Sequence, residues 1–240
     1  MKYNNWKYNP KTKGSGIICC IPQKGKCPYN CPDCFYQSGR SYLEPLDDNL
    51  PHIPGTDLTE NRIVRMNDGN DSNYKRKLVE AVASGYKHVF FNTSEPIDLD
   101  KFPGPFVLTV NPREMTDFDF HKVHPIPKNI MYVRVRVNTW NPEVLTSAID
   151  YYTSRQVRVI ITFMSYYTET IPEDQKEFYV YAKRVTNSYW NMKRSMQKDI
   201  LSAFEDNPYV YECGYKDTHS CKFCGNCLRE YYRVIEECRT

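Results

Sequence analysis

Three cysteines near the amino end of the chain stand at a spacing that can hold a metal cluster. Cys27, Cys31 and Cys34 form a C-x3-C-x2-C motif in a short loop. Three thiolates can bind three irons of a four-iron, four-sulfur cluster and leave the fourth iron without a protein ligand. A small molecule can bind such an open iron, and chemistry can begin there. A zinc knuckle that lacks its fourth ligand is the alternative, because zinc prefers four tetrahedral ligands.

A second cysteine group lies near the carboxyl end of the chain. Cys221, Cys224 and Cys227 form a C-x2-C-x2-C motif, and Cys213 precedes them. The four thiols are a complete ligand set, and the tight triplet is similar to a ferredoxin cluster loop. Four cysteines also bind zinc in tetrahedral geometry. The spacing therefore predicts a second metal site and leaves the metal open between an iron–sulfur cluster and zinc.

The composition predicts a soluble globular protein with one main core. The chain has 240 residues, of which 40% are hydrophobic and 25% are charged, and its formal net charge is +3. So small a charge does not by itself indicate a nucleic-acid partner. The amino terminus lacks the apolar run of a signal peptide, and no stretch approaches the ~20 apolar residues of a membrane span. We therefore expect a cytoplasmic protein with no membrane partner, in which clustered cysteines bind metal rather than form disulfides.

Hydrophobic periodicity predicts alternating strands and helices from about residue 71 onward. Before that point, an apolar strand precedes the first cysteine motif and stops at Pro22. Residues 38–70 are rich in Pro, Gly, Asp and Asn and are predicted to be mostly loop. The expected strands are 16–21, 87–91, 106–110, 131–137, 157–163 and 209–212, and the expected helices are 72–84, 141–152, 173–185 and 191–205.

This alternation predicts an α/β fold built from parallel βαβ units. About six strands are too few for an eight-stranded barrel, whereas a partial barrel or a flat, doubly wound sheet fits the same periodicity. We expect three parts along the chain. Residues 1–15 form an amino-terminal arm that is a solvated tail, residues 16–206 form the main α/β domain, and residues 207–240 form a small cysteine-rich metal-binding extension.

Alternation along the strands also predicts which side chains face the interior of a barrel. The three valines at 133–137 share the face on which helices should pack, so Arg134 and Arg136 are expected to point inward. Arg158 is expected to point inward from the next strand. Buried arginines are costly unless they are paired or hydrated. They indicate either a site for anionic groups, with Arg136 nearest its ligand-binding end, or a structural network of ion pairs.

The first cysteine motif and the segments after it resemble the radical S-adenosylmethionine (SAM) family. The resemblance covers residues 16 to 165 and implies a partial (β/α)6 TIM-like barrel whose cysteine loop holds a SAM-binding 4Fe-4S cluster with an open site. Residues 93–96, Thr-Ser-Glu-Pro, are similar to the Gly-Gly-Glu-Pro segment that binds the amino group of SAM in many members. Asp33 stands where many members have an aromatic residue. The candidate cofactor-binding residues are Phe35, Thr93, Ser94, Glu95, Asn111, Arg136 and Asn138.

The resemblance implies an enzyme that cleaves SAM reductively to a 5′-deoxyadenosyl radical, which abstracts hydrogen from a small molecule, peptide or nucleotide. The electron would come from a reductant such as flavodoxin or ferredoxin. Many members carry an auxiliary cluster in a C-terminal extension, which favours iron–sulfur over zinc at the second site. Two alternatives remain: a non-enzymatic protein with two structural metal sites, of the kind that contacts nucleic acid, and a degenerate radical SAM fold that binds a nucleotide without cleaving it.

Overall fold

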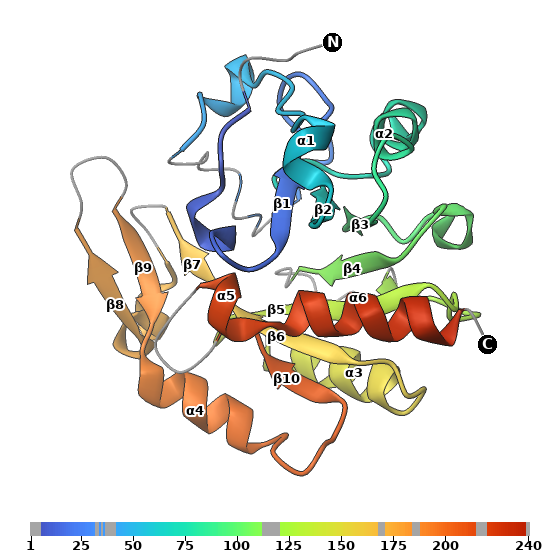
Figure 1. The fold of residues 1–240 in the computed structure, drawn as a ribbon. Helices are drawn as coiled ribbons and strands as arrows, with labels where there is room; N and C mark the ends of the chain where they lie inside the picture. The colour runs from blue at the N-terminus through green and yellow to red at the C-terminus, as the bar shows by residue number, and fades with distance from the viewer. Residues whose placement is uncertain are drawn as a thin grey trace.

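A seven-stranded parallel sheet forms the centre of the computed structural model, which describes residues 6–31, 34, 36, 42–111, 121–167, 171–183, 188–214 and 220–238 (Figure 1). Every pairing in this sheet is parallel. The strands are β1 (Ile17–Cys20), β2 (Ile63–Met66), β3 (Val89–Thr93), β4 (Phe106–Val110), β5 (Ile130–Val137), β6 (Val159–Phe163) and β10 (Val210–Glu212). The expected α/β fold with parallel strands is confirmed.

The strand order excludes the doubly wound alternative. The strands follow one another as β1-β2-β3-β4-β5-β6-β10, without the reversal that defines a doubly wound sheet. Among the described residues, β1 and β10 lie at the two edges and do not pair, so the sheet is not closed. The sheet has one strand more than the six expected. This additional strand, β2, lies in the segment expected to be mostly loop. Its four residues are too few to show a period, and they include the buried Arg65.

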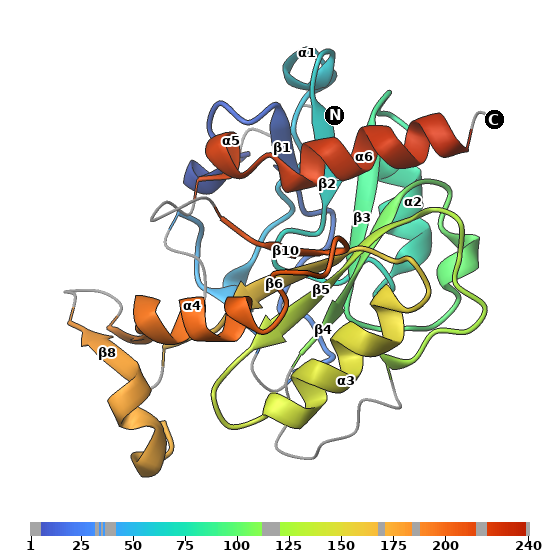
Figure 2. The ribbon, with the colours of Figure 1, turned by 90° about the horizontal axis from the view of Figure 1, so that it is seen from below.

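Two helices cover the outer face of the sheet. Side chains of α2 (Arg76–Ala83) and α3 (Pro142–Thr153) pack with the valines at 133–137 in one apolar core. Strand side chains alternate between faces, so Arg134 and Arg136 lie on the inner face, as expected. Figure 2 shows α3 and the C-terminal helix on opposite sides of the sheet.

The C-terminal helix α6 (Asn226–Glu237) covers the part of the inner face near the amino ends of the strands. Its Tyr231 and Val234 pack on apolar residues at or near the amino ends of six strands, among them Phe90 and Ile160. Its Glu230 is fully buried and forms ion pairs with Arg158 at 3.2 Å, Arg229 at 2.8 Å and Arg233 at 2.7 Å. Arg158 therefore belongs to a structural network of ion pairs, which was one of the two expected roles for the inward arginines.

A smaller antiparallel sheet lies between β6 and β10 in the chain and projects to the left in both ribbon views (Figures 1 and 2). Its strands are β7 (Ser165–Tyr166), β8 (Tyr179–Ala182) and β9 (Tyr189–Met192). The helix expected at 173–185 is wrong, because a 3-10 helix at Glu173–Phe178 leads directly into β8. Tyr179 packs there with Met192 in a small core of its own, which a strand presents better than a helix. The next helix, α4 (Arg194–Ser202), confirms the one expected at 191–205.

The described part of the amino-terminal arm packs against the fold. Asn9, Thr12 and Ser15 are buried, and the indole nitrogen of Trp6 donates a hydrogen bond to the carbonyl of Cys19 at 2.9 Å. The expected solvated tail is therefore wrong for residues 6–15. Among the residues that the structure describes, no helix is both long and apolar enough to cross a membrane. The remaining short elements are α1 (Thr56–Thr59), α5 (Cys221–Cys224) and 3-10 helices at Pro10–Thr12, Leu46–Asp48 and Leu99–Lys101.

Candidate metal centres and cofactor site

The first cysteine loop leaves the sheet at the carboxyl end of β1. Cys31 is buried, and Cys27 and Cys34 are half-buried. The Cys34 amide donates a hydrogen bond to the Cys31 carbonyl at 3.3 Å, which closes a tight turn between two predicted ligands. Burial raises the pKa of the Cys27 thiol to about 12, although a hydrogen bond from the Tyr29 backbone opposes the rise. Phe35, one of the predicted cofactor-binding residues, lies outside the described residues.

The cysteine loop meets the segment that follows β3. The Sγ of Cys31 lies 3.4 Å from the Oγ of Ser94, although 63 residues separate them in the chain. Glu95 is half-buried beside this contact in the chain. The structure therefore brings two separately predicted motifs, the cysteine loop and residues 93–96, to one place at the carboxyl ends of the strands.

Two polar residues that follow β2 fix the shape of this second motif. The buried carboxylate of Asp71 accepts hydrogen bonds from the Ser94 amide and from the Thr93 hydroxyl, both at 2.7 Å. The side-chain amide of Asn73 donates to the Glu95 carbonyl at 2.9 Å. Burial raises the pKa of Asp71, and these hydrogen bonds oppose the rise. Neither residue could be predicted as part of the site from the sequence, because the strand that precedes them lies in a segment expected to be mostly loop.

A row of polar side chains crosses the inner face near the cysteine loop. Arg136 is register partner to Thr162 on β6, and Asn111 directly follows β4. The Oδ1 of Asn111 and the Oγ1 of Thr162 are buried and have no hydrogen-bond partner among the described residues. Burial lowers the pKa of Arg136, and the nearby Cys34 partly offsets this effect. The row can therefore offer a cation, an acceptor and a hydroxyl to a ligand.

Asn138, the last predicted cofactor-binding residue, is engaged in the turn after β5. Its side-chain amide donates to the Oδ1 of Asn141 at 2.8 Å and to the hydroxyl of Tyr166 at 3.1 Å. Its Oδ1 accepts from the amides of Trp140 at 3.3 Å and Asn141 at 2.9 Å. These four bonds use both donors and both acceptor positions of an asparagine amide. The geometry is that of a residue that holds the turn.

A buried carboxylate anchors the far end of the cysteine loop. Asp68 is 5% exposed, forms an ion pair with Arg65 at 2.9 Å and accepts a hydrogen bond from the Tyr36 hydroxyl at 2.6 Å. The amide of Asn9 also donates to it. Burial opposes its charge, but Arg65 and these hydrogen bonds hold the pKa of Asp68 well below its usual range. Since Tyr36 lies two residues after Cys34, Asp68 ties the loop to β2.

The C-terminal cysteines gather around α5, beside the inner face. Cys213 follows β10, Cys221 and Cys224 begin and end α5, and Cys227 lies in the first turn of α6. The Gly214 amide donates a hydrogen bond to the Sγ of Cys224 at 3.3 Å. A hydrogen bond from the Cys213 thiol lowers the pKa of Cys224 to about 6, and backbone donors at Asn226 and Gly214 add to the effect.

The donor chemistry of both groups fits thiolate-bound metals. Across the described ranges, no three His, Cys, Asp or Glu side chains already stand in a metal-binding arrangement. Within each group, however, the thiols lie close enough for their charges to raise one another's pKa. Three thiols in one loop and four in a second group are the donor sets that iron–sulfur clusters use, and N–H groups directed at sulfur accompany such sites. Metal binding would require the side chains to rotate so that the thiols converge.

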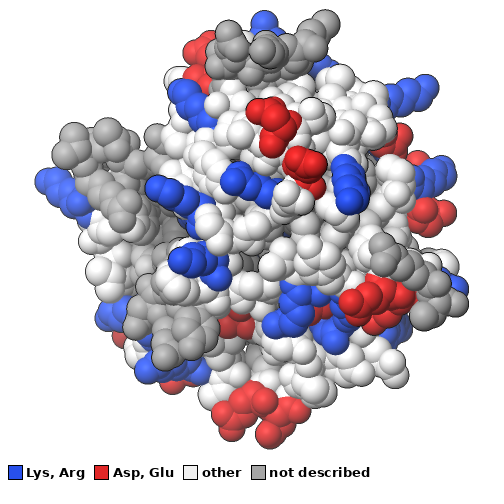
Figure 3. Space-filling model, in the orientation of Figure 1, with Lys and Arg blue, Asp and Glu red and all other residues white. Residues whose placement is uncertain are grey.

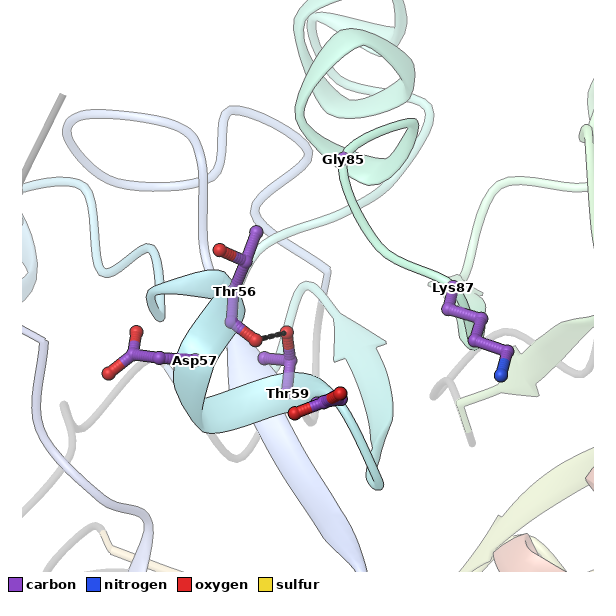
Figure 4. Close-up of a pocket in the computed structure, with 6 residues that line it drawn as sticks. Thr56, Asp57, Thr59, Gly85 and Lys87 are labelled. Carbon is purple, nitrogen blue, oxygen red and sulfur yellow. Dashed lines mark hydrogen bonds between the residues drawn. The ribbon is translucent and has the colours of Figure 1, made fainter.

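A surface hollow lies far along the strands from these groups. Figure 4 shows it between α1 and the turn that leads into β3, lined by residues that include Asp57, Gly85 and Lys87. These residues precede β2 and β3, whereas the cysteine loop and residues 93–96 follow the strands. The hollow therefore lies at the amino ends of the strands, opposite the cysteine loop, and contains none of the predicted site residues.

Comparison of the chain with protein-family models, with curated proteins and with solved structures finds no match in any of the three. The functional interpretation therefore depends on the residues and on their arrangement.

Proposed function

We propose that the protein is a radical SAM enzyme of the cytoplasm, that its sheet is a partial (β/α)6 TIM-like barrel, and that Cys27, Cys31 and Cys34 hold a 4Fe-4S cluster with an open site. The observation that carries the proposal is the 3.4 Å approach of Cys31 to Ser94. It joins the two motifs that the family uses on one ligand, and nothing in their sequence separation requires them to meet.

The arrangement of the inner face supports the same proposal. When bound, the cluster and SAM supply a 5′-deoxyadenosyl radical that removes hydrogen from the substrate. Glu95 and the carbonyls of residues 93–95 suit the ammonium group of SAM, and Arg136 suits its carboxylate. The α6 helix closes the interior from the amino ends of the strands, which helps to exclude water from a reactive radical. Asn111 offers its buried acceptor to a hydroxyl or amine of the bound molecule.

The remaining parts of the proposal concern the partners. Cys213, Cys221, Cys224 and Cys227 hold an auxiliary 4Fe-4S cluster in preference to zinc. A flavodoxin or ferredoxin supplies the electron, and the substrate is a small molecule, a peptide or a nucleotide. On the face that Figure 3 shows, Lys and Arg are interspersed with Asp and Glu rather than gathered in one broad basic patch, so this face does not favour the alternative of a non-enzymatic protein that binds nucleic acid.

Anaerobic reconstitution tests this function. Iron, sulfide and zinc are counted, and the loaded protein is then mixed with dithionite and SAM and assayed for 5′-deoxyadenosine. We expect cleavage with about eight irons per chain for two clusters, or about four irons with one zinc if the second site holds zinc. An iron-loaded protein that does not cleave SAM would contradict the proposal.

A matched pair of cysteine variants makes the test specific. Cys31→Ala should lose about four irons and all SAM cleavage, because two thiolates cannot hold the open cluster. Cys238→Ala is the control, since Cys238 is exposed at the end of α6 and belongs to neither group. It should keep both the iron content and the cleavage of the unaltered enzyme.

A further inference from the structure

One inner-face residue of β5 contacts the C-terminal cysteine group, and a second is hydrogen-bonded to that residue. The hydroxyl of Tyr132, a residue only 1% exposed, lies 2.9 Å from the Sγ of Cys227. Arg134 donates a hydrogen bond to that hydroxyl oxygen at 3.1 Å and another to the Oγ1 of Thr109 at 3.3 Å. Because the phenol oxygen already accepts from Arg134, its own hydrogen can point at the sulfur. Tyr132 can therefore donate to the sulfur of Cys227.

The charge of Arg134 is matched differently from that of other inner-face arginines. Arg65 pairs with Asp68, and Arg158 pairs with Glu230. In the described part of the chain, Arg134 makes no ion pair with a carboxylate. Its neighbours are instead the Tyr132 hydroxyl and thiols of the C-terminal group. Burial opposes its charge, but Tyr132, Cys227 and Cys213 raise the pKa of Arg134 above that of a free arginine.

This arrangement is favourable when the thiols are deprotonated. A neutral thiol does little to offset a desolvated guanidinium, whereas thiolates do, and metal binding is what keeps several adjacent thiols deprotonated. Four thiolates around a divalent metal or a 2+ cluster leave a net negative charge, which a cation beside them offsets. A donor aimed at a ligating sulfur also fixes the orientation of that ligand.

The same residues lie between the two cysteine groups. Arg134 and Arg136 are neighbours on the inner face of β5, and their charges act on each other, while Cys34 and Cys31 act on Arg136. On the other side, the charge of Arg65 acts on the thiol of Cys221. Tyr132, which contacts Cys227, lies on the same face of β5 as Arg136, so the C-terminal group lies beside the inner face that Arg136 also occupies.

We propose that Tyr132 and Arg134 are positioning residues of a metal centre formed by Cys213, Cys221, Cys224 and Cys227, and that this centre forms part of the wall of the interior faced by the first cysteine loop. The proposal rests on the second metal site of the proposed function and not on SAM cleavage. It gives the C-terminal centre a place beside the reaction space rather than the role of a remote structural staple.

The test isolates the C-terminal site in the full-length protein. Cys27, Cys31 and Cys34 are replaced with Ala, and Co²⁺ is the probe, because its absorption reports tetrahedral thiolate ligation. In this background we expect Co²⁺ to bind. Tyr132→Phe should weaken its binding about tenfold and Arg134→Met about 10- to 100-fold, the usual cost of losing an outer hydrogen-bonding partner. Arg134→Lys keeps the positive charge and should recover part of the loss.

Tyr151→Phe is the matched control. Tyr151 lies on α3, on the outer face, and its hydroxyl donates to the carbonyl of Val123 at 3.0 Å, so the variant loses one hydroxyl hydrogen bond far from the thiols. It should bind Co²⁺ as the background protein does. Circular dichroism checks that each variant is folded. If Arg134→Met does not fold, Tyr132→Phe and Arg134→Lys decide the question.

Three results would overturn the proposal: no thiolate absorption with Co²⁺ in the background protein, unchanged affinity in folded Tyr132→Phe and Arg134→Met, or an equal loss in Tyr151→Phe. None of these depends on SAM. A protein that behaves as expected with Co²⁺ but never cleaves SAM in its unaltered, iron-loaded form keeps this proposal and loses the proposed enzyme function. The reverse outcome keeps the enzyme and loses the positioning role.

Discussion

The two halves of the sheet's inner face differ sharply, although the same strands supply both. Near the amino ends, Phe90 and Ile160 pack under α6, and Glu230 matches the charges around it. Near the carboxyl ends, Arg136 and Thr162 share a polar surface with the first cysteine loop. One half is closed by the chain itself, whereas the other presents polar atoms that the described residues leave without partners.

The arginines show what this difference means. Arg158 has a buried carboxylate at 3.2 Å, so its charge is matched within the fold. Arg136 lies beside cysteines and a second arginine, and burial lowers its pKa. A cation paired with a buried carboxylate contributes to the fold, whereas a buried cation beside thiols and polar side chains is suited to an anionic ligand. One half of the inner face therefore contributes to stability, and the other half is the part that we propose binds the ligand.

Removal of the Glu230 carboxylate should produce the largest loss of stability. Glu230→Ala leaves Arg158, Arg229 and Arg233 without their shared buried partner, and breaking such a pair costs about 3–5 kcal/mol. Urea unfolding measures the loss. The control is Glu237→Ala, because Glu237 is 58% exposed and its ion pair with Arg233, at 2.6 Å, lies near the surface. It should cost less than about 1 kcal/mol. Equal effects of the two variants would remove the distinction.

Asp68 should give the next largest effect, and one that depends on pH. Asp68→Asn weakens the bonds to Arg65 and Tyr36 and should cost about 2–4 kcal/mol at neutral pH. The pKa of Asp68 is held below its usual value in the folded protein, so its contribution is full above roughly pH 4, the pKa of an unfolded Asp, and is lost as pH falls further.

Unfolding curves of the two proteins between neutral and acid pH check this expectation. The advantage of the unaltered protein over Asp68→Asn should be constant at neutral pH and shrink below roughly pH 4. An advantage that stays constant into strong acid would mean that the carboxylate charge is not what stabilises the anchor. Loss of iron from the first cysteine loop alone, with no loss of stability, would place the effect in the loop instead.

Long periodic elements of the fold could be predicted from sequence, and short ones could not. The valines at 133–137 alternate over a strand of eight residues, which fixed the inner face and the arginines on it. β2 has four residues and gave no period, so Asp68, Asp71 and Asn73, which follow it, had no predicted position. Residues 173–185 contain enough helix-forming residues to predict a helix, but packing of Tyr179 in a small core favours a strand there.

The candidate site was predictable only in part for a related reason. Spacing alone identified the two cysteine groups, because metal ligands often lie close together in the chain. The contact between Cys31 and Ser94 spans 63 residues, and only the family resemblance linked the two motifs before the structure did. Nothing in the sequence indicated that Tyr132 would meet Cys227, because that contact depends on α6 folding back over the inner face.

Arg136 tests the binding half of the inner face most directly. Arg136→Met should leave stability within about 1 kcal/mol of the original, because burial opposes the charge that the substitution removes. SAM binding should weaken roughly 10- to 100-fold, the cost of losing hydrogen bonds to a charged group. Arg158→Met should show the opposite pattern, with a measurable loss of stability, because Glu230 loses one of three arginine partners, and unchanged SAM affinity. Titration of the reconstituted variants with SAM measures the affinity, and urea unfolding measures the stability.

Substitution of Ser94 should have the smallest effect. It distinguishes a role in SAM binding from a role in holding the cysteine loop. Ser94→Ala loses the hydroxyl that approaches Cys31 at 3.4 Å and Asp71 at 3.2 Å, but it keeps the amide bond to Asp71 at 2.7 Å. The turn should therefore persist, with a loss of about 0.5–1.5 kcal/mol and SAM binding weakened about threefold to tenfold. Ser202→Ala, which removes an exposed hydroxyl on α4, should change neither quantity. If Ser94→Ala lowers iron content as much as Cys31→Ala does, the hydroxyl stabilises the cysteine loop itself. Its role in SAM binding could then not be separated from its role in cluster binding.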